Sequence, residues 1–229
     1  MLKPTIFREY DIRGAADVEL LDADVVVLGQ AFGTYLIRHA GPNITLGRDT
    51  RLSSPRLRDA LMQGLKAAGC NVTDLGVVPT PLLYYSVVHL KADGGVMITG
   101  SHNPPEFNGF KICVGTGSLH GDGIQRLRQL IEAAQFPTGN GTYREEGVID
   151  GYIADIVART GTLSRRLKVV FDCGNGVGAV VAPELFSKIG IDPVFLYAES
   201  DGTFPNHHPD PTVVANLQDL IAAVKREKR

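Results

Sequence analysis

Apolar and polar positions along the chain follow two different periods. Short apolar runs of the length of buried strands occur at residues 44–46, 71–75, 94–99 and 109–114. Between and after them, apolar residues recur at the three- and four-residue spacing of amphipathic helices, at residues 22–38, 54–68, 79–90 and 121–134. This alternation predicts an α/β fold with three layers, in which helices cover both faces of one sheet. Because runs 94–99 and 109–114 are adjacent and could pair antiparallel, we expect a mixed sheet.

Polar residues at the helix ends predict where two of these helices begin. Asp22 or Asp24 is expected to cap the first one, because a carboxylate can accept a hydrogen bond from a free backbone amide. Ser53 or Ser54 is expected to cap the second, with Pro55 in its first turn.

A second, shorter pattern follows the polar, Gly-rich residues 137–150, which read as a domain boundary that can still contain a strand. It predicts strands at 168–172 and 193–197 and helices at 151–160, 179–189 and 216–229. In the last helix, the side chains expected to face inward are Leu217, Leu220, Ile221 and Val224. We therefore predict one domain at residues 1–148 and an incomplete, similar one at 149–229.

The last predicted helix is not followed by another strand. A parallel strand–helix unit normally continues into the next strand, so we expect the chain to end inside this unit. Its sheet would then have an unpaired edge, which makes self-association possible. The final basic run, Lys225 to Arg229, is most simply the cationic last turn of the helix.

Composition and charge narrow the function classes. With 44% hydrophobic residues, 21% charged residues and a net charge of −2, the chain is typical of a globular protein and offers no electrostatic case for binding nucleic acid or a membrane surface. The three widely spaced cysteines predict neither a disulfide framework nor a metal site and favour a cytoplasmic location. The N-terminus does not have the pattern of a secretory signal, and no run approaches the roughly 20 apolar residues of a membrane span.

The most informative chemistry lies between the runs 94–99 and 109–114. Gly100 is expected to adopt backbone angles that a side chain would forbid, and a Pro-Pro pair stiffens the loop. Ser101 would then stand at the end of a core strand beside His102, Asn103 and Lys111. A hydroxyl in this position suits a nucleophile or a phosphate carrier. The alternative is a Pro-rich connection whose polar side chains only satisfy backbone groups.

Residues 99–112, Thr-Gly-Ser-His-Asn-Pro followed by Asn-Gly-Phe-Lys, closely resemble the phosphoserine loop of the α-D-phosphohexomutases, the phosphomannomutase and phosphoglucomutase family. Further stretches that resemble this family lie at residues 7–14, 47–51, 172–176 and 204–211. The resemblance covers nearly all of this chain but only the first part of such an enzyme.

The resemblance implies phosphoryl transfer between the C1 and C6 oxygens of a hexose phosphate, with Ser101 as phosphoserine and a hexose 1,6-bisphosphate as intermediate and activator. Mg²⁺ would be bound through the phosphate on Ser101. Lys111 would be the general acid/base, helped by Arg13, and His102 would orient the proton transfer or share it. The resemblance also implies substrate contacts from Tyr10, Arg13, Asn103, His207 and His208.

The chain departs from the family pattern in one respect. The family's Asp-Gly-Asp-x-Asp-Arg metal loop does not occur within the 229 residues and is expected beyond Arg229. We therefore expect this chain alone to be inactive. Whether the substrate is a mannose, glucose or glucosamine phosphate is left open.

A second interpretation comes from residues 174–179, which fit G-x-G-x-x-A after a predicted strand, with Glu199 placed where a ribose-binding acid would be. This pattern predicts a nucleotide-binding or a non-catalytic interaction module, or simply a tight turn.

His207 and His208 are adjacent, so they make a poor metal pair and are expected to be surface residues. Asp49 between Arg48 and Arg51 predicts a structural ion-pair cluster.

Overall fold

The computed structural model describes residues 2–161 and 163–227. Its first part is built on one sheet with the strand order β1-β5-β4-β2-β3-β7, in which β6 also pairs with β5. The strands are β1 (Ile12–Ala15), β2 (Asn43–Arg48), β3 (Asn71–Val77), β4 (Gly94–Ile98), β5 (Phe107–Val114), β6 (Gly117–Ser118) and β7 (Tyr143–Glu145). β4, β2, β3 and β7 are parallel to one another, whereas β5 is antiparallel to both β4 and β1. The expected mixed sheet is confirmed.

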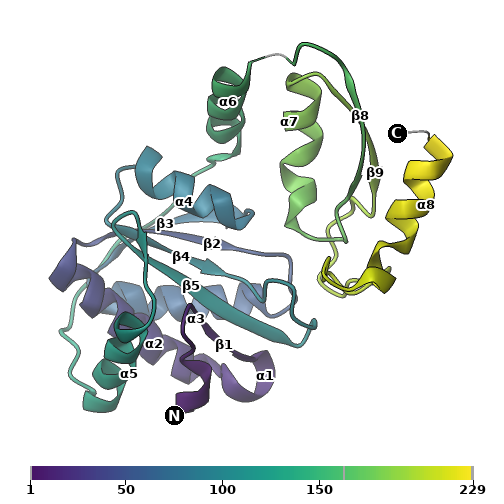
Figure 1. Ribbon diagram of the computed structural model, residues 1–229. Helices are drawn as coiled ribbons and strands as arrows, with labels where there is room; N and C mark the ends of the chain where they lie inside the picture. The colour runs from purple at the N-terminus through teal and green to yellow at the C-terminus, as the bar shows by residue number, and fades with distance from the viewer. Residues whose placement is uncertain (1, 162, 228–229) are drawn as a thin grey trace.

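Helices cover both faces of this sheet (Figure 1), as predicted. On one face lie α2 (Asp22–His39), α3 (Ser54–Ala67) and α5 (Asp122–Ala133), and on the other lies α4 (Thr80–His89). The short helices η1 (Pro4–Ile6) and α1 (Ala16–Glu19) flank β1. Successive side chains of β4 pack on opposite faces of the sheet. Val96 and Ile98 belong to the core under α2 and α3, whereas Met97 belongs to the core under α4.

The helices α2 and α3 approach each other backbone to backbone. A Cβ atom on Gly64 would lie 2.0 Å from the carbonyl oxygen of Val26, and one on Gly29 would lie 2.4 Å from that of Leu61. Glycine at these two positions therefore sets the distance between the helices.

The predicted cap of α2 is wrong, and that of α3 is right in position only. The residue before α2 is Leu21 and makes no side-chain cap, while Asp22 is inside the helix and pairs with Arg56. Ser53 is at the cap position of α3, with Pro55 in the first turn, but its side chain makes no cap bond, and its hydroxyl accepts a hydrogen bond from the Asn108 amide at 2.9 Å. These polar groups are used for contacts between distant segments, which no local pattern can show.

The second part begins with α6 (Ile149–Thr160) and contains two parallel strands, β8 (Leu167–Asp172) and β9 (Ile191–Leu196). Helix α7 (Ala182–Lys188) lies between the strands in sequence, and η3 (Val214–Leu217) leads into α8 (Gln218–Glu227). The single helix expected at 179–189 is instead a turn, η2 (Val177–Val180), followed by α7, since Pro183 is tolerated only in the first turn of a helix.

The predicted inward face of the last helix needs a correction. Leu217, Leu220 and Val224 are half-buried as expected, but Ile221 is 39% exposed and Ala223 is buried. The face toward the protein is thus Leu220, Ala223 and Val224, which also have helical spacing. The predicted residues 228–229 of this helix lie outside the described residues.

The segment around the predicted boundary packs on the first part. β7 falls within the predicted boundary 137–150 and pairs with β3, so it extends the first sheet. Helix α6 places the ring of Tyr152 edge-on against Tyr85 of α4, with their centroids 5.3 Å apart, and contributes Ile153 to the core under α4. A division at residues 148–149 stays a prediction.

In the described part of the chain no helix is long and apolar enough to cross a membrane.

Candidate functional site

Ser101 lies in the loop between β4 and β5, at the carboxyl end of β4, and is exposed. Its backbone has a φ of +54°, in the left-handed region that few residues other than glycine adopt. The Ser101 amide donates to the Thr99 hydroxyl at 2.9 Å, and both the backbone and side-chain amides of Asn103 donate to the Gly100 carbonyl, at 3.0 and 2.9 Å. The loop is therefore a tight, internally bonded turn.

Arg51 holds this loop from inside the protein. It comes from the segment after β2, and its side chain has no exposed surface. Its guanidinium donates to the carbonyl oxygens of Ser101 at 2.9 Å, Asn103 at 2.6 Å, Pro104 at 2.5 Å and Phe107 at 3.0 Å. The sequence analysis placed Arg51 only in an ion-pair cluster and missed this role.

Asp49 balances the buried charge of Arg51. Its carboxylate lies 3.3 Å from Arg51 Nε and accepts hydrogen bonds from the Ser54 hydroxyl at 2.5 Å and the Gly100 amide at 3.1 Å. Burial lowers the pKa of Arg51, and the Asp49 carboxylate opposes that shift. The predicted pairing of Asp49 with Arg51 is confirmed.

Gly100 is needed for a reason other than the expected one. Its φ lies outside the left-handed region, and the residue with unusual angles is Ser101 itself. A Cβ atom on Gly100 would lie 2.3 Å from Arg51 Cζ and 2.7 Å from the Phe107 carbonyl oxygen. Glycine is required because the guanidinium packs directly on the backbone.

Arg13 and Lys111 meet around a third residue, Asp11. The Asp11 carboxylate lies 2.5 Å from the Arg13 guanidinium and 3.3 Å from Lys111 Nζ, and it is 8% exposed. The pairing of β1 with β5 brings these residues together, since Arg13 lies opposite Gly109. Asp11 was part of a family-like stretch but was not singled out. The neighbouring Tyr10 is 73% exposed.

His102 contacts the second part of the chain. Its Nδ1 lies 3.4 Å from Asp210 Oδ1, in the segment between β9 and α8 that approaches the loop between β4 and β5 (Figure 1). Hydrogen bonds from the hydroxyl and the amide of Thr212, with a smaller effect of His102, lower the pKa of Asp210 to about 2. Asp210 therefore offers a carboxylate to His102, a contact between distant segments that the sequence analysis did not predict.

His207 is not the surface residue that was expected. Its side chain is 16% exposed, Nδ1 donates to the His208 carbonyl at 2.9 Å, and Nε2 lies 3.0 Å from the Asp172 carboxylate at the end of β8. Partial burial acts to lower the pKa of His207, but these two partners outweigh it and the pKa is raised. Both ring nitrogens face acceptors, so the doubly protonated ring fits this position. His208 is half-buried and provides its carbonyl oxygen.

The glycine-rich turn after β8 does not favour nucleotide binding. Asn175 is buried, with a φ of +57°, and its side chain donates to the Glu199 carbonyl and accepts from Asn206, both at 2.8 Å. Helix α7 begins only at Ala182, after η2. A dinucleotide fingerprint needs a helix N-terminus within the motif to bind the pyrophosphate.

Within the described residues, no group of three or more His, Cys, Asp or Glu side chains could hold a metal ion. The described residues therefore do not by themselves form the expected Mg²⁺ site. The only ligand that sequence analysis assigned to it was a phosphate on Ser101.

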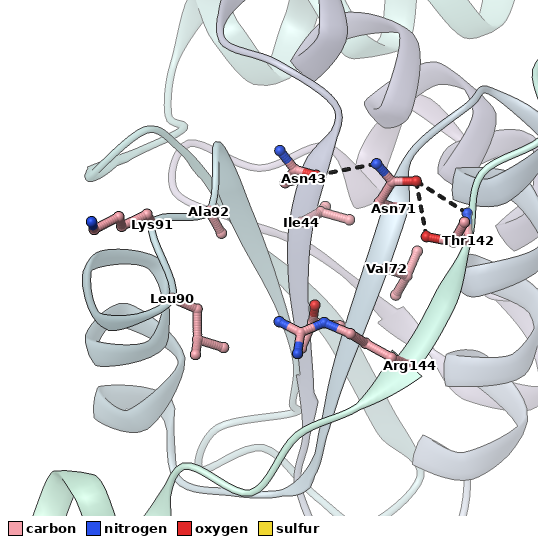
Figure 2. Close-up of a pocket in the computed structure, with 10 residues that line it drawn as sticks. Asn43, Ile44, Asn71, Val72, Leu90, Lys91, Ala92, Thr142 and Arg144 are labelled. Atoms are coloured by element: carbon pink, nitrogen blue, oxygen red, sulfur yellow. Dashed lines mark hydrogen bonds between the residues drawn. The ribbon is translucent and has the colours of Figure 1, made fainter.

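A hollow of about 400 Å³ lies at the amino ends of β2 and β3 (Figure 2). Asn43, Asn71 and Thr142 bond to one another there, and Arg144 pairs with Glu146 at 2.5 Å. Because Ser101 follows the carboxyl end of β4, which is parallel to β2, this hollow is at the opposite edge of the sheet. It is therefore remote from Ser101 and is not the candidate site.

Comparisons with known proteins identify the family to which the chain belongs. The family model described as phosphoglucomutase/phosphomannomutase, alpha/beta/alpha domain I matches residues 4–138, and that of domain II matches residues 150–229. A phosphomannomutase/phosphoglucomutase of Pseudomonas syringae is 45% identical over 225 residues, which are 98% of this chain and 48% of that protein. A phosphoglucomutase of Neisseria meningitidis is 41% identical over 222 residues, 96% of this chain and 48% of the relative.

Solved structures are similar over the same extent. A phosphoglucomutase/phosphomannomutase family protein of Burkholderia thailandensis has a TM-score of 0.94 and 42% identity, covering 99% of this chain and 51% of that one. A putative phosphomannomutase of Thermus thermophilus has a TM-score of 0.83 and 28% identity, covering 98% and 52%. The chain spans about half the length of the curated relatives it matches. By these matches and by its fold, the chain belongs to the phosphoglucomutase/phosphomannomutase family.

Proposed function

We propose that this chain contributes the phosphate-carrying part of a hexose phosphate mutase, with Ser101 as the phosphorylated residue. The observation that carries the proposal is the exposed Ser101 in a loop whose carbonyl groups are fixed by the buried Arg51. Phosphoryl transfer depends on positioning and on neutralising charge. A rigid loop between β4 and β5, with Lys111 on β5 and Arg13 on the neighbouring β1, serves both needs.

In the proposed reaction, the phosphorus–oxygen bond to Ser101 breaks while a bond forms to a free hydroxyl at C1 or C6 of the sugar phosphate. The hydroxyl gives its proton to a base, an acid gives a proton to the departing Ser101 Oγ, and the sugar becomes a 1,6-bisphosphate. Return of the other phosphate to Ser101 completes the exchange. We propose Lys111 as the general acid/base, with its amine fixed by Asp11, while Arg13 adds positive charge.

Other residues would orient the sugar or the loop. Tyr10 is exposed and can contact a sugar, and His102 can share the proton transfer from its place next to Ser101. Asn103 uses its side chain inside the loop, so we propose that it acts there. We retain His207 and His208 as proposed substrate contacts from the second part of the chain. The names of the relatives favour mannose or glucose phosphate as substrate.

Mg²⁺ would add positive charge at the phosphate on Ser101 when bound. Among the described residues, no group of three or more His, Cys, Asp or Glu side chains could hold the ion without that phosphate. We also propose that the 229 residues alone do not complete the reaction. Isomerisation of glucose or mannose 1-phosphate by the purified chain, abolished by Ser101→Ala, would contradict this part.

Phosphate mapping tests the assignment of Ser101. The chain is incubated with glucose 1,6-bisphosphate and Mg²⁺, digested, and analysed by mass spectrometry. One phosphate is expected on the peptide that contains Ser101, none in Ser101→Ala, and an unchanged amount in Ser118→Ala, because Ser118 is another exposed serine but lies in β6. Phosphate on any other residue would overturn the assignment.

A further inference from the structure

A turn of the second part, residues 201–204, packs on Arg51. The ring centroid of Phe204 lies 5.2 Å from Arg51 Cζ, within the range of a cation–π contact. Since the Arg51 side chain has no exposed surface, Phe204 is part of what separates this guanidinium from water. Arg51, which holds the Ser101 loop, is thus covered by a residue about 150 positions further along the chain.

The turn has a defined structure of its own. The amide and hydroxyl of Thr203 donate to Asp201 Oδ1 at 2.9 and 2.7 Å, and the Phe204 amide donates to the Asp201 carbonyl at 3.0 Å. Phe204 has a φ of +51°, in the left-handed region that bulky residues rarely adopt. Such backbone angles persist only where the surroundings fix them. The ring of Phe204 is therefore held in position.

Gly202 seats the turn against the backbone of the first part. A Cβ atom at this position would lie 2.2 Å from the Thr50 carbonyl oxygen and 2.8 Å from Arg51 Cα. The two backbones thus touch with no room for a side chain. Further along the same segment, Asp210 reaches His102, the neighbour of Ser101, at 3.4 Å. Two separate contacts from this segment converge on the Ser101 loop.

We propose that Phe204 is a positioning residue for the Ser101 loop. By covering Arg51, it excludes water that would compete for the guanidinium donors, so the bonds to the carbonyl groups of Ser101 and its neighbours stay strong. The second part of the chain thereby fixes the geometry of a loop that belongs to the first part. That this loop carries phosphate rests on the function proposed above, whereas the contact itself does not.

The test is amide hydrogen exchange of the 229-residue chain, measured by NMR without any phosphate ligand. In Phe204→Ala, the amides of Ser101, Asn103 and Phe107 are expected to exchange at least ~10-fold faster, while the amides of β2 and β4 change less than ~2-fold. Phe204→Tyr keeps an aromatic face and is expected to restore protection. Val214→Ala is the control, because Val214 follows in the same part of the chain and is 66% exposed.

Two further readouts keep the test decisive. The Arg51 Nε–H resonance should carry a ring-current shift in the wild type and in Phe204→Tyr, and lose it in Phe204→Ala. Gly202→Ala keeps the ring but pushes the turn away from Thr50, and it should also speed exchange of the loop amides. The proposal is overturned if Phe204→Ala and Gly202→Ala leave those amides within ~2-fold of the wild type, or if Val214→Ala speeds them equally. None of these readouts depends on whether Ser101 is phosphorylated.

Discussion

The two parts of the chain are built from the same kinds of element but differ in how deeply they bury them. In β4 every residue is buried, and β2 is buried at four consecutive positions. In β8 and β9 no residue of the described strands is fully buried. The first part therefore has the packing needed for a rigid site, while the second contributes segments that reach over to it.

This difference shows where precision in the site comes from. The Ser101 loop is anchored by Arg51 and Asp49, which are buried in the first part. The contacts from the second part, Phe204 on Arg51 and Asp210 on His102, come from an irregular segment. One side of such a site, the Ser101 loop, is held by buried residues of the first part. The order of the other side depends on how the second part docks.

The largest expected effect comes from removing the buried charge of the first part. Arg51→Met should lower the free energy of unfolding of that part by about 3–5 kcal/mol, because Asp49 and the loop carbonyl groups lose their partner while buried. The matched change in the second part, Arg159→Met, removes an exposed ion pair with Asp155 and should cost less than ~1 kcal/mol. Urea denaturation of both variants measures the two costs. Similar values for the two would break the comparison.

A smaller contrast is expected between two glycines. Gly64→Ala should cost about 1–3 kcal/mol, because the new Cβ would meet the Val26 carbonyl oxygen at 2.0 Å and push α2 from α3. At Gly178 the nearest atom is the ring of Phe171 at 3.6 Å, so Gly178→Ala should change stability by less than about 1 kcal/mol in either direction. Thermal unfolding by calorimetry is the measurement. A neutral Gly64→Ala would show that the two helices can shift apart freely.

Thiol labelling sharpens the comparison without any mutation. Burial raises the pKa of Cys113 and of Cys173 to about 11, so the two thiols differ little in intrinsic reactivity. Cys113 is buried in β5, whereas Cys173 is half-buried at the end of β8. We expect Cys173 to react at least ~10-fold faster with a thiol reagent at pH 8, as followed by peptide mass. Equal rates would mean that both parts open equally often.

The smallest effect concerns His207. Its pKa is raised above 6.5 in the folded chain, so its contribution to stability is complete below pH 6.5 and is lost as the pH rises through the folded pKa. The loss should be small, because burial of the ring opposes the stabilisation that its two acceptors give to the protonated form. In urea unfolding monitored at β8 and β9, the midpoint should fall between pH 6 and 9 in the wild type and stay level in His207→Gln. A midpoint that rises with pH in the wild type would contradict the assignment.

The longer strands and helices were predictable from local pattern, because each is a short apolar run or carries apolar residues at helical spacing. The short elements β1, α1 and β6 were not predicted. The loop with Ser101 was also predictable, because its residues lie together in the sequence. The position of β7 against β3, about 70 residues earlier, was not, since its three residues carry no strong period of their own.

The residues that support the site were harder to foresee. An arginine in a polar stretch reads as a surface charge, and Arg51 is buried because residues 100–107 fold over it and Phe204 packs on it. Asp11 lies between two cations only once β1 pairs with β5. Phe204 was visible as part of a family-like stretch, but its contact with Arg51 depends on how the two parts of the chain dock. Such roles arise from tertiary structure and leave no local signal.

The backbone at Ser101 also limits which amino acid can bear the hydroxyl there. A φ of +54° is tolerated by serine, but the branched Cβ of threonine would clash with its own backbone in that region. Ser101→Thr, a mild change in chemical terms, would force either the loop or the hydroxyl out of place. Glycine would relax the backbone and abolish the oxygen. Among the genetically encoded residues with an alkyl hydroxyl, only serine has a side chain that fits these backbone angles. The backbone of the turn thus restricts which amino acid can occupy the position.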